Sequence, residues 1–288
     1  SAKRYWTDMA RIAAQTSKLQ LLNSPILVAP DIYEETNGIG YVQMDVVNGV
    51  SLRELLDGSL LPRLQSRASP DEWARLNDAV FRPGPGPRPR IQPGIVLYVM
   101  RFVLRGLESL HAMGYVHSDV KPANLMVDRL GIVKIIDYGR AMLADEKMTL
   151  LLGTPAYMAP EIHREHVARV RSDLYSLGLV GLEMLRGEPL FPPLEIPDTE
   201  EGLLAAKLEL PSPLHDLLPD YVLRNEDFTR VLFRLLDPDP ANRYPSAAEA
   251  EADLGHIHKQ LTLVGKDSDY TRDLESVISC AVNPLGPS

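Results

Sequence analysis

The chain has 288 residues, of which 45% are apolar and 24% charged, and its formal net charge is −9. This composition predicts a soluble globular protein and excludes the disordered and fibrous classes. The acidic balance argues against a nucleic-acid-binding module and against a polybasic membrane-surface protein. Because Cys280 is the single cysteine, no internal disulfide can form, and we expect a reducing compartment, the cytoplasm. No run of about 18 apolar residues predicts a membrane span, and no charged-then-apolar leader opens the chain.

The first 50 or so positions predict one helix and two strands. Apolar residues recur at helical spacing from Tyr5 to Leu22, which is typical of an amphipathic helix. Ile26–Val28 and Tyr41–Val47 predict strands, separated by a turn around Asn37-Gly38. Ser51 is placed to cap a short helix that follows it.

Residues 62–93 have a different composition and are interpreted as a Pro-rich insert. Phe81–Arg90 alternates proline with glycine and arginine, and we expect neither helix nor strand but a polyproline-like surface loop. A solvated insertion is the simple interpretation of this loop. A proline-rich ligand for a partner protein is the more specific one.

The rest of the chain predicts brief strands followed by helices. The residues between Leu174 and Leu185 are nearly all apolar, so we expect a buried central helix there. No strong pattern marks the last twenty or so residues. A small stranded part followed by a helical bulk predicts two unequal lobes and an α+β fold. The other expected helices are Ile95–His111, Phe228–Leu236 and Ala247–Ile257, and the expected strands are Tyr115–Val116, Leu125–Val127 and Val133–Ile136.

One loop carries three polar functions between apolar segments. Asp119 can accept a hydroxyl proton, Lys121 can neutralise a phosphoryl oxygen, and Asn124 can give an oxygen ligand to Mg²⁺. Asp137 follows the expected strand at Val133–Ile136 and can hold Mg²⁺ against a triphosphate, because hard cations prefer carboxylate oxygens. These residues together indicate phosphoryl transfer.

The same residues resemble the eukaryotic-type protein kinases, especially the Ser/Thr kinases of that kind in bacteria. His117–Asn124 is similar to the kinase catalytic loop, and Asp137-Tyr138-Gly139 to the Asp-Phe-Gly metal motif. Ala159-Pro160-Glu161 matches the Ala-Pro-Glu motif. Three further segments resemble, in order, the part that holds the protein substrate, the start of the central helix, and the late segment whose Arg pairs with Glu161: Gly153–Met158, Asp173–Gly178 and Asp239–Arg243.

The resemblance implies a bilobal kinase-like fold with an incomplete N-lobe. Residues 1–47 would form the partial N-lobe, with the regulatory helix and two strands. Residues 48–260 would form a complete, mainly helical C-lobe that includes the insert at about 62–93. Residues 261–288 would be a C-terminal tail.

ATP and Mg²⁺ are the cofactors that the resemblance implies, and the substrate is a protein with Ser/Thr acceptors. Lys121 stands where Ser/Thr kinases carry a lysine. Thr154 occupies the position whose hydroxyl bonds the catalytic Asp119 and Lys121, while Asn124 and Asp137 would bind the metal. The expected nucleotide contacts are the gatekeeper Met44, the backbone of Asp45 and Val47 at the adenine edge, and Met126 on the other face of the base.

Three features depart from the family pattern. No Gly-rich loop precedes Tyr41, and Lys3 is the sole candidate for the strand lysine, so we expect weak turnover from this chain. Gln15 stands where the ion-pairing glutamate is expected, and an amide cannot form that charge-assisted pair. Ser118 replaces the loop arginine, which removes the positive pocket for a phosphate on the following loop.

These features leave more than one function open. A Ser/Thr protein kinase is favoured because Asp119, Lys121, Asn124 and Asp137 are all intact. The alternative is a pseudokinase or kinase-like interaction scaffold, suggested by Gln15 and by the Pro-rich insert. Phosphotransfer to a small molecule on the same fold is disfavoured, because the segments that position protein substrates are present.

Overall fold

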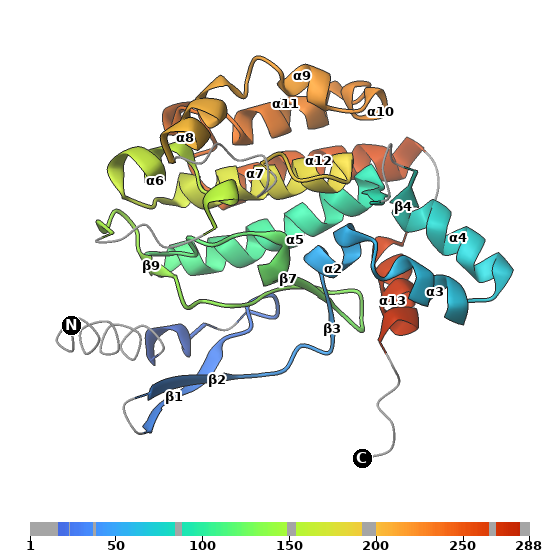
Figure 1. Cartoon of the computed structure of the whole chain (residues 1–288), viewed down its shortest axis with the longest axis horizontal. Coiled ribbons are helices and arrows are strands. Elements are labelled where there is room, and N and C mark those ends of the chain that lie inside the picture. The colour runs from blue at the N-terminus through green and yellow to red at the C-terminus, as the bar shows by residue number, and fades with distance from the viewer. Residues whose placement is uncertain are drawn as a thin grey trace.

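The computed structural model describes residues 17–22, 24–36, 39–83, 88–148, 154–191, 200–264 and 269–282. Figure 1 shows a small stranded part at one end and a larger body of packed helices beyond it. The predicted α+β class with a mainly helical larger lobe is therefore confirmed. Gln15 and Lys3 lie outside the described residues, as does most of the predicted helix between Tyr5 and Leu22.

The small part contains an antiparallel pair of strands, β1 (Pro30–Thr36) and β2 (Ile39–Met44). The prediction of a strand at Ile26–Val28 is wrong, because Leu27 makes only an isolated bridge to Ile135. The backbone of this segment bonds instead to Ile135, which donates to Ile26 O and accepts from Val28 N. These bonds attach the segment to the larger part of the chain rather than to β1 and β2.

A three-stranded sheet joins the small part to the helical body, in the order β3 (Gly49–Ser51), β7 (Leu125–Asp128) and β8 (Val133–Ile135). A Cβ at Gly49 would lie 2.1 Å from Val127 O, so only glycine allows this close pairing. Ser51 then caps helix α2 (Leu52–Asp57), as predicted, in a capping box with Glu54.

The predicted Pro-rich insert contains regular structure that its composition did not indicate. Helices α3 (Leu61–Arg67) and α4 (Pro70–Val80) precede strand β4 (Phe81–Arg82), which pairs with β5 (Arg90–Ile91). The expectation that Phe81–Arg90 holds no strand is therefore wrong at both ends. Phe81 and Ile91 are buried opposite each other, and this burial favours the pairing. Residues 84–87 lie outside the described part.

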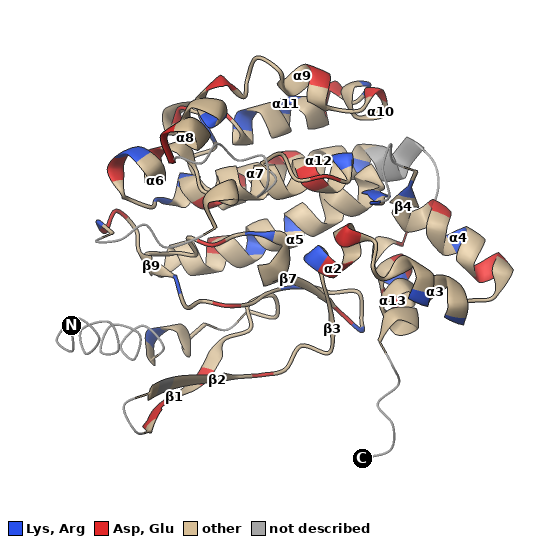
Figure 2. Ribbon diagram, viewed as in Figure 1, with Lys and Arg blue, Asp and Glu red and all other residues tan. Residues whose placement is uncertain are grey.

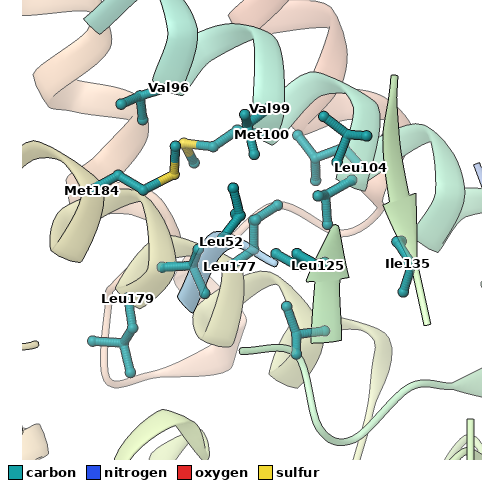
Figure 3. Close-up of a cluster of buried hydrophobic side chains, with 14 of the residues drawn as sticks. Leu52, Val96, Val99, Met100, Leu104, Leu125, Ile135, Leu177, Leu179 and Met184 are labelled. Carbon is teal, nitrogen blue, oxygen red and sulfur yellow. The ribbon is translucent and has the colours of Figure 1, made fainter. Parts of the chain in front are cut away.

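The hydrophobic core of the large part lies between α5 (Pro93–Ala112) and α7 (Val170–Arg186). Figure 3 shows Met100 of α5 and Leu177 of α7 in this core, with Leu125 from β7 beside them. A Cβ at Gly181 would lie 2.7 Å from Met100 Sδ, so the glycine lets the two helices approach closely. The predicted buried central helix is thus confirmed in α7.

Further elements surround this pair of helices. The predicted strands at Tyr115–Val116, Leu125–Val127 and Val133–Ile136 are confirmed, as are the late helices. Within the described residues, no helix is both long and apolar enough to cross a membrane. The remaining elements are β6 (Tyr115–Val116), β9 (Met142–Leu143), α6 (Pro160–Glu165), α8 (Glu200–Glu209), α9 (Leu214–Leu217), α10 (Asp220–Leu223), α11 (Glu226–Leu235), α12 (Ala247–Val264), and three 3₁₀ turns at Pro122–Asn124, Pro155–Tyr157 and Pro240–Asn242.

Helix α13 (Tyr270–Ala281) corrects the expectation that the end of the chain carries no pattern. Its apolar face contributes Leu274, Val277 and Ile278 to the core, each fully buried. The helix packs against α3, α4, α5 and β7, close to the start of the insert (Figure 1). The part of residues 261–288 that the structure describes is therefore integrated into the large body and is not a free tail.

Candidate active site

Asp173, near the start of α7, holds the loop that follows β6. Its carboxylate accepts hydrogen bonds from His117 N at 2.8 Å, from Ser118 N at 2.9 Å and from His111 Nε2 at 2.9 Å. Burial by itself raises the pKa of Asp173, but the bonds from His111 and His117 outweigh it and the pKa lies below its ordinary value. The anion therefore fixes the backbone of the loop, with Ser118 in a left-handed conformation at φ +64°.

Asp119, Lys121 and Thr154 form a closed set of contacts. Lys121 Nζ lies 2.7 Å from Asp119 Oδ2 and donates to Thr154 Oγ1 at 2.9 Å. Thr154 Oγ1 in turn donates to Asp119 Oδ1 at 3.1 Å. The three predicted catalytic residues thus meet, although Thr154 comes from a segment far along the chain. The arrangement places a carboxylate, which can accept a proton, beside an ammonium group, which can neutralise charge on a phosphoryl group. Phosphoryl transfer to a hydroxyl group uses both.

Asn124 and Asp137, the predicted metal ligands, lie on connected segments. Asn124 Nδ2 donates to Asp119 O at 2.9 Å and to Asp119 Oδ2 at 3.1 Å, which leaves the amide oxygen for a cation. Asn124 O accepts from Ile136 N at 3.0 Å, and this bond holds the two segments together next to Asp137. Asp137 is exposed, with φ +64°.

The donor set at this position fits Mg²⁺. An amide oxygen and a carboxylate are both hard oxygen ligands, and Mg²⁺ usually takes only one or two carboxylates together with substrate phosphates. No group of three or more His, Cys, Asp or Glu side chains suited to a metal occurs in the described part of the chain. A metal at this site would thus be shared with a phosphorylated substrate.

The predicted nucleotide contacts lie where β2 ends and on β7. Met44 is the last residue of β2, and Asp45 and Val47 follow it in non-regular backbone. Met126 lies on β7, opposite Ser51. A cavity of about 520 Å³ adjoins this segment, but neither methionine lines it. That cavity lies instead between residues 45–48, the segment 22–31 and the β7–β8 turn.

Two basic residues near the site were missed in the sequence. Arg140 Nη1 lies 3.2 Å from Asp119 Oδ1, so a second cation faces this carboxylate. Arg140 directly follows the Asp137-Tyr138-Gly139 motif, and this position was the one sign in the sequence that its side chain lies near Asp119. Lys207 of α8 is fully buried, and its Nζ donates to Met158 O at 2.7 Å. A lysine within an otherwise mixed helix gave no sign of this burial.

The expected pair of Glu161 and Arg243 is present and buried. Arg243 Nη1 donates to Glu161 Oε1 at 2.8 Å and Nη2 to Oε2 at 2.9 Å, with both side chains fully inaccessible. Ser172 Oγ also donates to Glu161 Oε1 at 2.7 Å. Glu161 lies in α6, and Arg243 follows the 3₁₀ turn Pro240–Asn242. The pair therefore joins α6 to the segment between α11 and α12.

Similarity to known proteins identifies the family of this chain. The family model of the protein kinase domain matches residues 7–253, and the chain belongs to that family. It is similar to the serine/threonine-protein kinase PknB of Mycolicibacterium smegmatis, 31% identical over 268 residues, which are 86% of this chain and 36% of that protein. PknB of Mycobacterium tuberculosis is 30% identical over 258 residues, which are again 86% of this chain and 36% of that protein. PknL of Mycobacterium tuberculosis is 34% identical over 196 residues, 67% of this chain and 46% of PknL.

The family match makes the chain a protein kinase domain, the relatives that it resembles are serine/threonine-protein kinases, and neither finding supports the pseudokinase alternative. The chain spans less than half the length of the three relatives.

Proposed function

We propose that this chain transfers the γ-phosphoryl group of ATP to serine and threonine hydroxyls of a protein substrate in the cytoplasm. The observation that supports it most is the mutual contact of Asp119, Lys121 and Thr154. A kinase needs a positioned proton acceptor and a cation beside it, and these three side chains supply both.

In this proposal Asp119 accepts the proton of the acceptor hydroxyl as its oxygen bonds to the γ-phosphorus. The bond between that phosphorus and the β–γ bridging oxygen breaks, and ADP leaves. Lys121 stabilises the negative charge on the transferring group, and Thr154 holds Lys121 and Asp119 in place. Asn124 and Asp137 would hold Mg²⁺, which neutralises phosphate charge when bound.

ATP is proposed to bind where β2 ends. Met44 and Met126 would contact the adenine ring, and the backbone of Asp45 and Val47 would bond its edge. In this reading residues 1–47 belong to the small lobe and residues 48–260 to the large lobe, which α13 extends.

Asp119→Asn tests the proposal most directly. An amide keeps the shape of the side chain but cannot accept the proton, so transfer should fall by at least about 100-fold while nucleotide binding remains. The assay measures labelled phosphate from ATP on matched peptides that contain Ser, Thr or Tyr. Asp145→Asn is the control, because Asp145 is an exposed carboxylate paired with Arg169. Equal transfer by Asp119→Asn and the parent, or transfer mainly to Tyr, would contradict the proposal.

A further inference from the structure

The C-terminal end of α7 gathers arginines from three parts of the chain. Helix α7 ends at Gly187, where φ is +81° and a Cβ would lie 2.9 Å from Pro89 O. The last residues of the Pro-rich insert therefore pack directly on the helix end. Arg90 Nε donates to Arg186 O at 3.2 Å, which fixes this contact. The insert thus brings Arg88 and Arg90 next to Arg186.

A fourth arginine reaches the same place from α2. Arg53 Nη1 lies 3.9 Å from Glu183 Oε1, and its side chain is 42% exposed. Glu183 is buried, and its Oε2 accepts the hydroxyl hydrogen bond of Tyr157. Arg88 and Arg186 also act electrostatically on Glu183. We call Arg53, Arg88, Arg90 and Arg186 the arginine cluster. Figure 2 shows a basic position at the start of α2.

The cluster has more positive charge than its described neighbours neutralise. Glu183 and Glu188 are the carboxylates that act on Arg186 there. Burial raises the pKa of Glu183, so its anionic form is disfavoured, and the carboxylate is shared with Tyr157. Arg186 Nη1 is buried and has no hydrogen-bond partner in the described part of the chain. In a protein of net charge −9, an unmatched basic cluster is a local exception.

Helix capping explains only part of this arrangement. Basic side chains near a helix C-terminus bond the last carbonyl groups, and Arg90 does so. Arg53 lies on another helix, is half exposed, and makes no such contact in the described structure. Its charge partner in the described structure is Glu183, whose Oε1 lies 3.9 Å away, beyond hydrogen-bond distance, so the guanidinium hydrogens of Arg53 remain available to an anionic ligand.

The cluster lies close to the proposed phosphoryl-transfer site. Thr154, bonded to Asp119, is followed by the 3₁₀ turn Pro155–Tyr157, and Tyr157 contacts Glu183. Such a turn rises about 2 Å per residue, so the Cα atoms of Thr154 and Tyr157 lie about 6 Å apart along it. An extended peptide advances about 3.3 Å per residue. A residue about two to four positions from the acceptor would therefore reach the cluster.

We propose that the arginine cluster is a substrate subsite that selects an anionic side chain near the phosphorylated residue. Aspartate and glutamate fit, as does a phosphorylated serine, because guanidinium forks bond carboxylate and phosphate oxygens in pairs. This inference rests on the proposed function, since it concerns the peptide that this function would modify.

Peptide binding tests the inference without requiring turnover. Fluorescence anisotropy would compare labelled Ser peptides that carry Asp, Ala, Arg or phosphoserine two to four positions on either side of the acceptor. Charged hydrogen bonds predict that the Asp peptide with the correct spacing binds about tenfold more tightly than its Ala counterpart. The preference should weaken as salt is added. The phosphoserine peptide shows whether phosphate binds better than carboxylate.

Arg53→Glu supplies the decisive variant. It should abolish the preference for Asp and favour the Arg peptide. Arg105→Glu is the matched control, because Arg105 is 48% exposed and pairs with Glu251 on another face. Equal binding of Asp and Ala peptides to the parent, or equal effects of the two variants, would overturn the inference.

The two proposals fail in different ways. If peptides are phosphorylated without any preference for acidic residues, the subsite is wrong and the proposed function stands. If acidic peptides bind preferentially but are never phosphorylated, the subsite stands and the proposed function is wrong.

Discussion

Arg243 illustrates how single residues hold the site from a distance. Its guanidinium group bonds Glu161 with two nitrogens, and its Nε donates to Asp237 O at 2.7 Å. Nη1 also donates to Arg171 O at 2.9 Å, and the group lies 4.7 Å from the ring centre of Tyr175. Each nitrogen of this buried guanidinium group thus donates to an acceptor, and the group also lies over an aromatic ring. These contacts offset part of the free-energy cost of removing the charge from water.

Arg243→Ala should therefore lower the free energy of unfolding by about 3–5 kcal/mol, because Glu161 would remain as a buried carboxylate without its cation. Urea denaturation measures the loss. Arg230→Ala is the control, since Arg230 is an exposed partner of Asp227 and its removal should cost about 0–1 kcal/mol. Equal midpoints for Arg243→Ala and the parent would contradict the prediction.

At the scale of an element, α8 supports the segment that follows Thr154. Lys207 donates to the carbonyl groups of Pro155 and Met158, and its Nζ lies 3.0 Å from His163 Nε2. His163 Nδ1 lies 3.1 Å from Glu200 Oε1 at the start of the same helix. One buried lysine therefore joins a helix to the backbone of a loop, which a sequence pattern does not indicate.

The pKa of Lys207 makes this contact sensitive to pH. Burial lowers the pKa from 10.5 to about 7, and Glu161 and Glu200 only partly oppose the shift. Between these two pH values the unfolded chain binds the proton that the folded chain has released. Stability from this group should thus rise with pH across that window and be lowest below it.

Lys207→Met removes the titrating group. We expect the unfolding free energy of the parent, relative to that of the variant, to increase between pH 7 and pH 9. Denaturation at both pH values measures the difference. Lys259→Met, on the exposed side of α12, is the matched control and should show no such change. A difference that stays constant with pH would contradict the prediction.

At the scale of the whole molecule, α13 connects the end of the chain to several distant segments. Arg67 Nη1 donates to Cys280 O at 3.0 Å and to Ala281 O at 3.1 Å, so a residue of α3 bonds the last carbonyl groups of α13. A Cβ at Gly131 would lie 2.1 Å from Thr271 O, so the β7–β8 turn also touches this helix. The helix therefore stabilises the sheet whose strand β7 directly follows Asn124 and whose strand β8 leads to Asp137.

Leu274→Ala in α13 should lower the unfolding free energy by about 2–5 kcal/mol, because a fully buried leucine leaves a cavity. Glu275 is exposed on the same helix, so Glu275→Ala is the control and should change the unfolding free energy by about 0.5 kcal/mol at most. Thermal and urea unfolding compare the two variants. Similar stabilities for both would mean that α13 does not contribute to the folded body.

Much of the fold was predictable because its signals are local. The apolar run in α7, the cap at Ser51 and the short strands β6, β7 and β8 each depend on neighbouring residues, and the structure contains these elements, whereas the strand predicted at Ile26–Val28 is absent. The kinase resemblance followed in the same way from contiguous motifs around Asp119 and Asp137. Glu161 and Arg243 were paired by that resemblance, not by any local pattern.

The sequence by itself determined the class of fold, the order of most elements and the residues expected in the site. Only the tertiary structure decided that the ends of the Pro-rich insert pair as strands, that α13 is buried, and that Arg140 faces Asp119. It also decided that Arg53 and Arg186 come together at the end of α7. The physical reason is that local propensity and capping act within a few residues, whereas burial and charge pairing depend on which distant segments the packed core brings into contact.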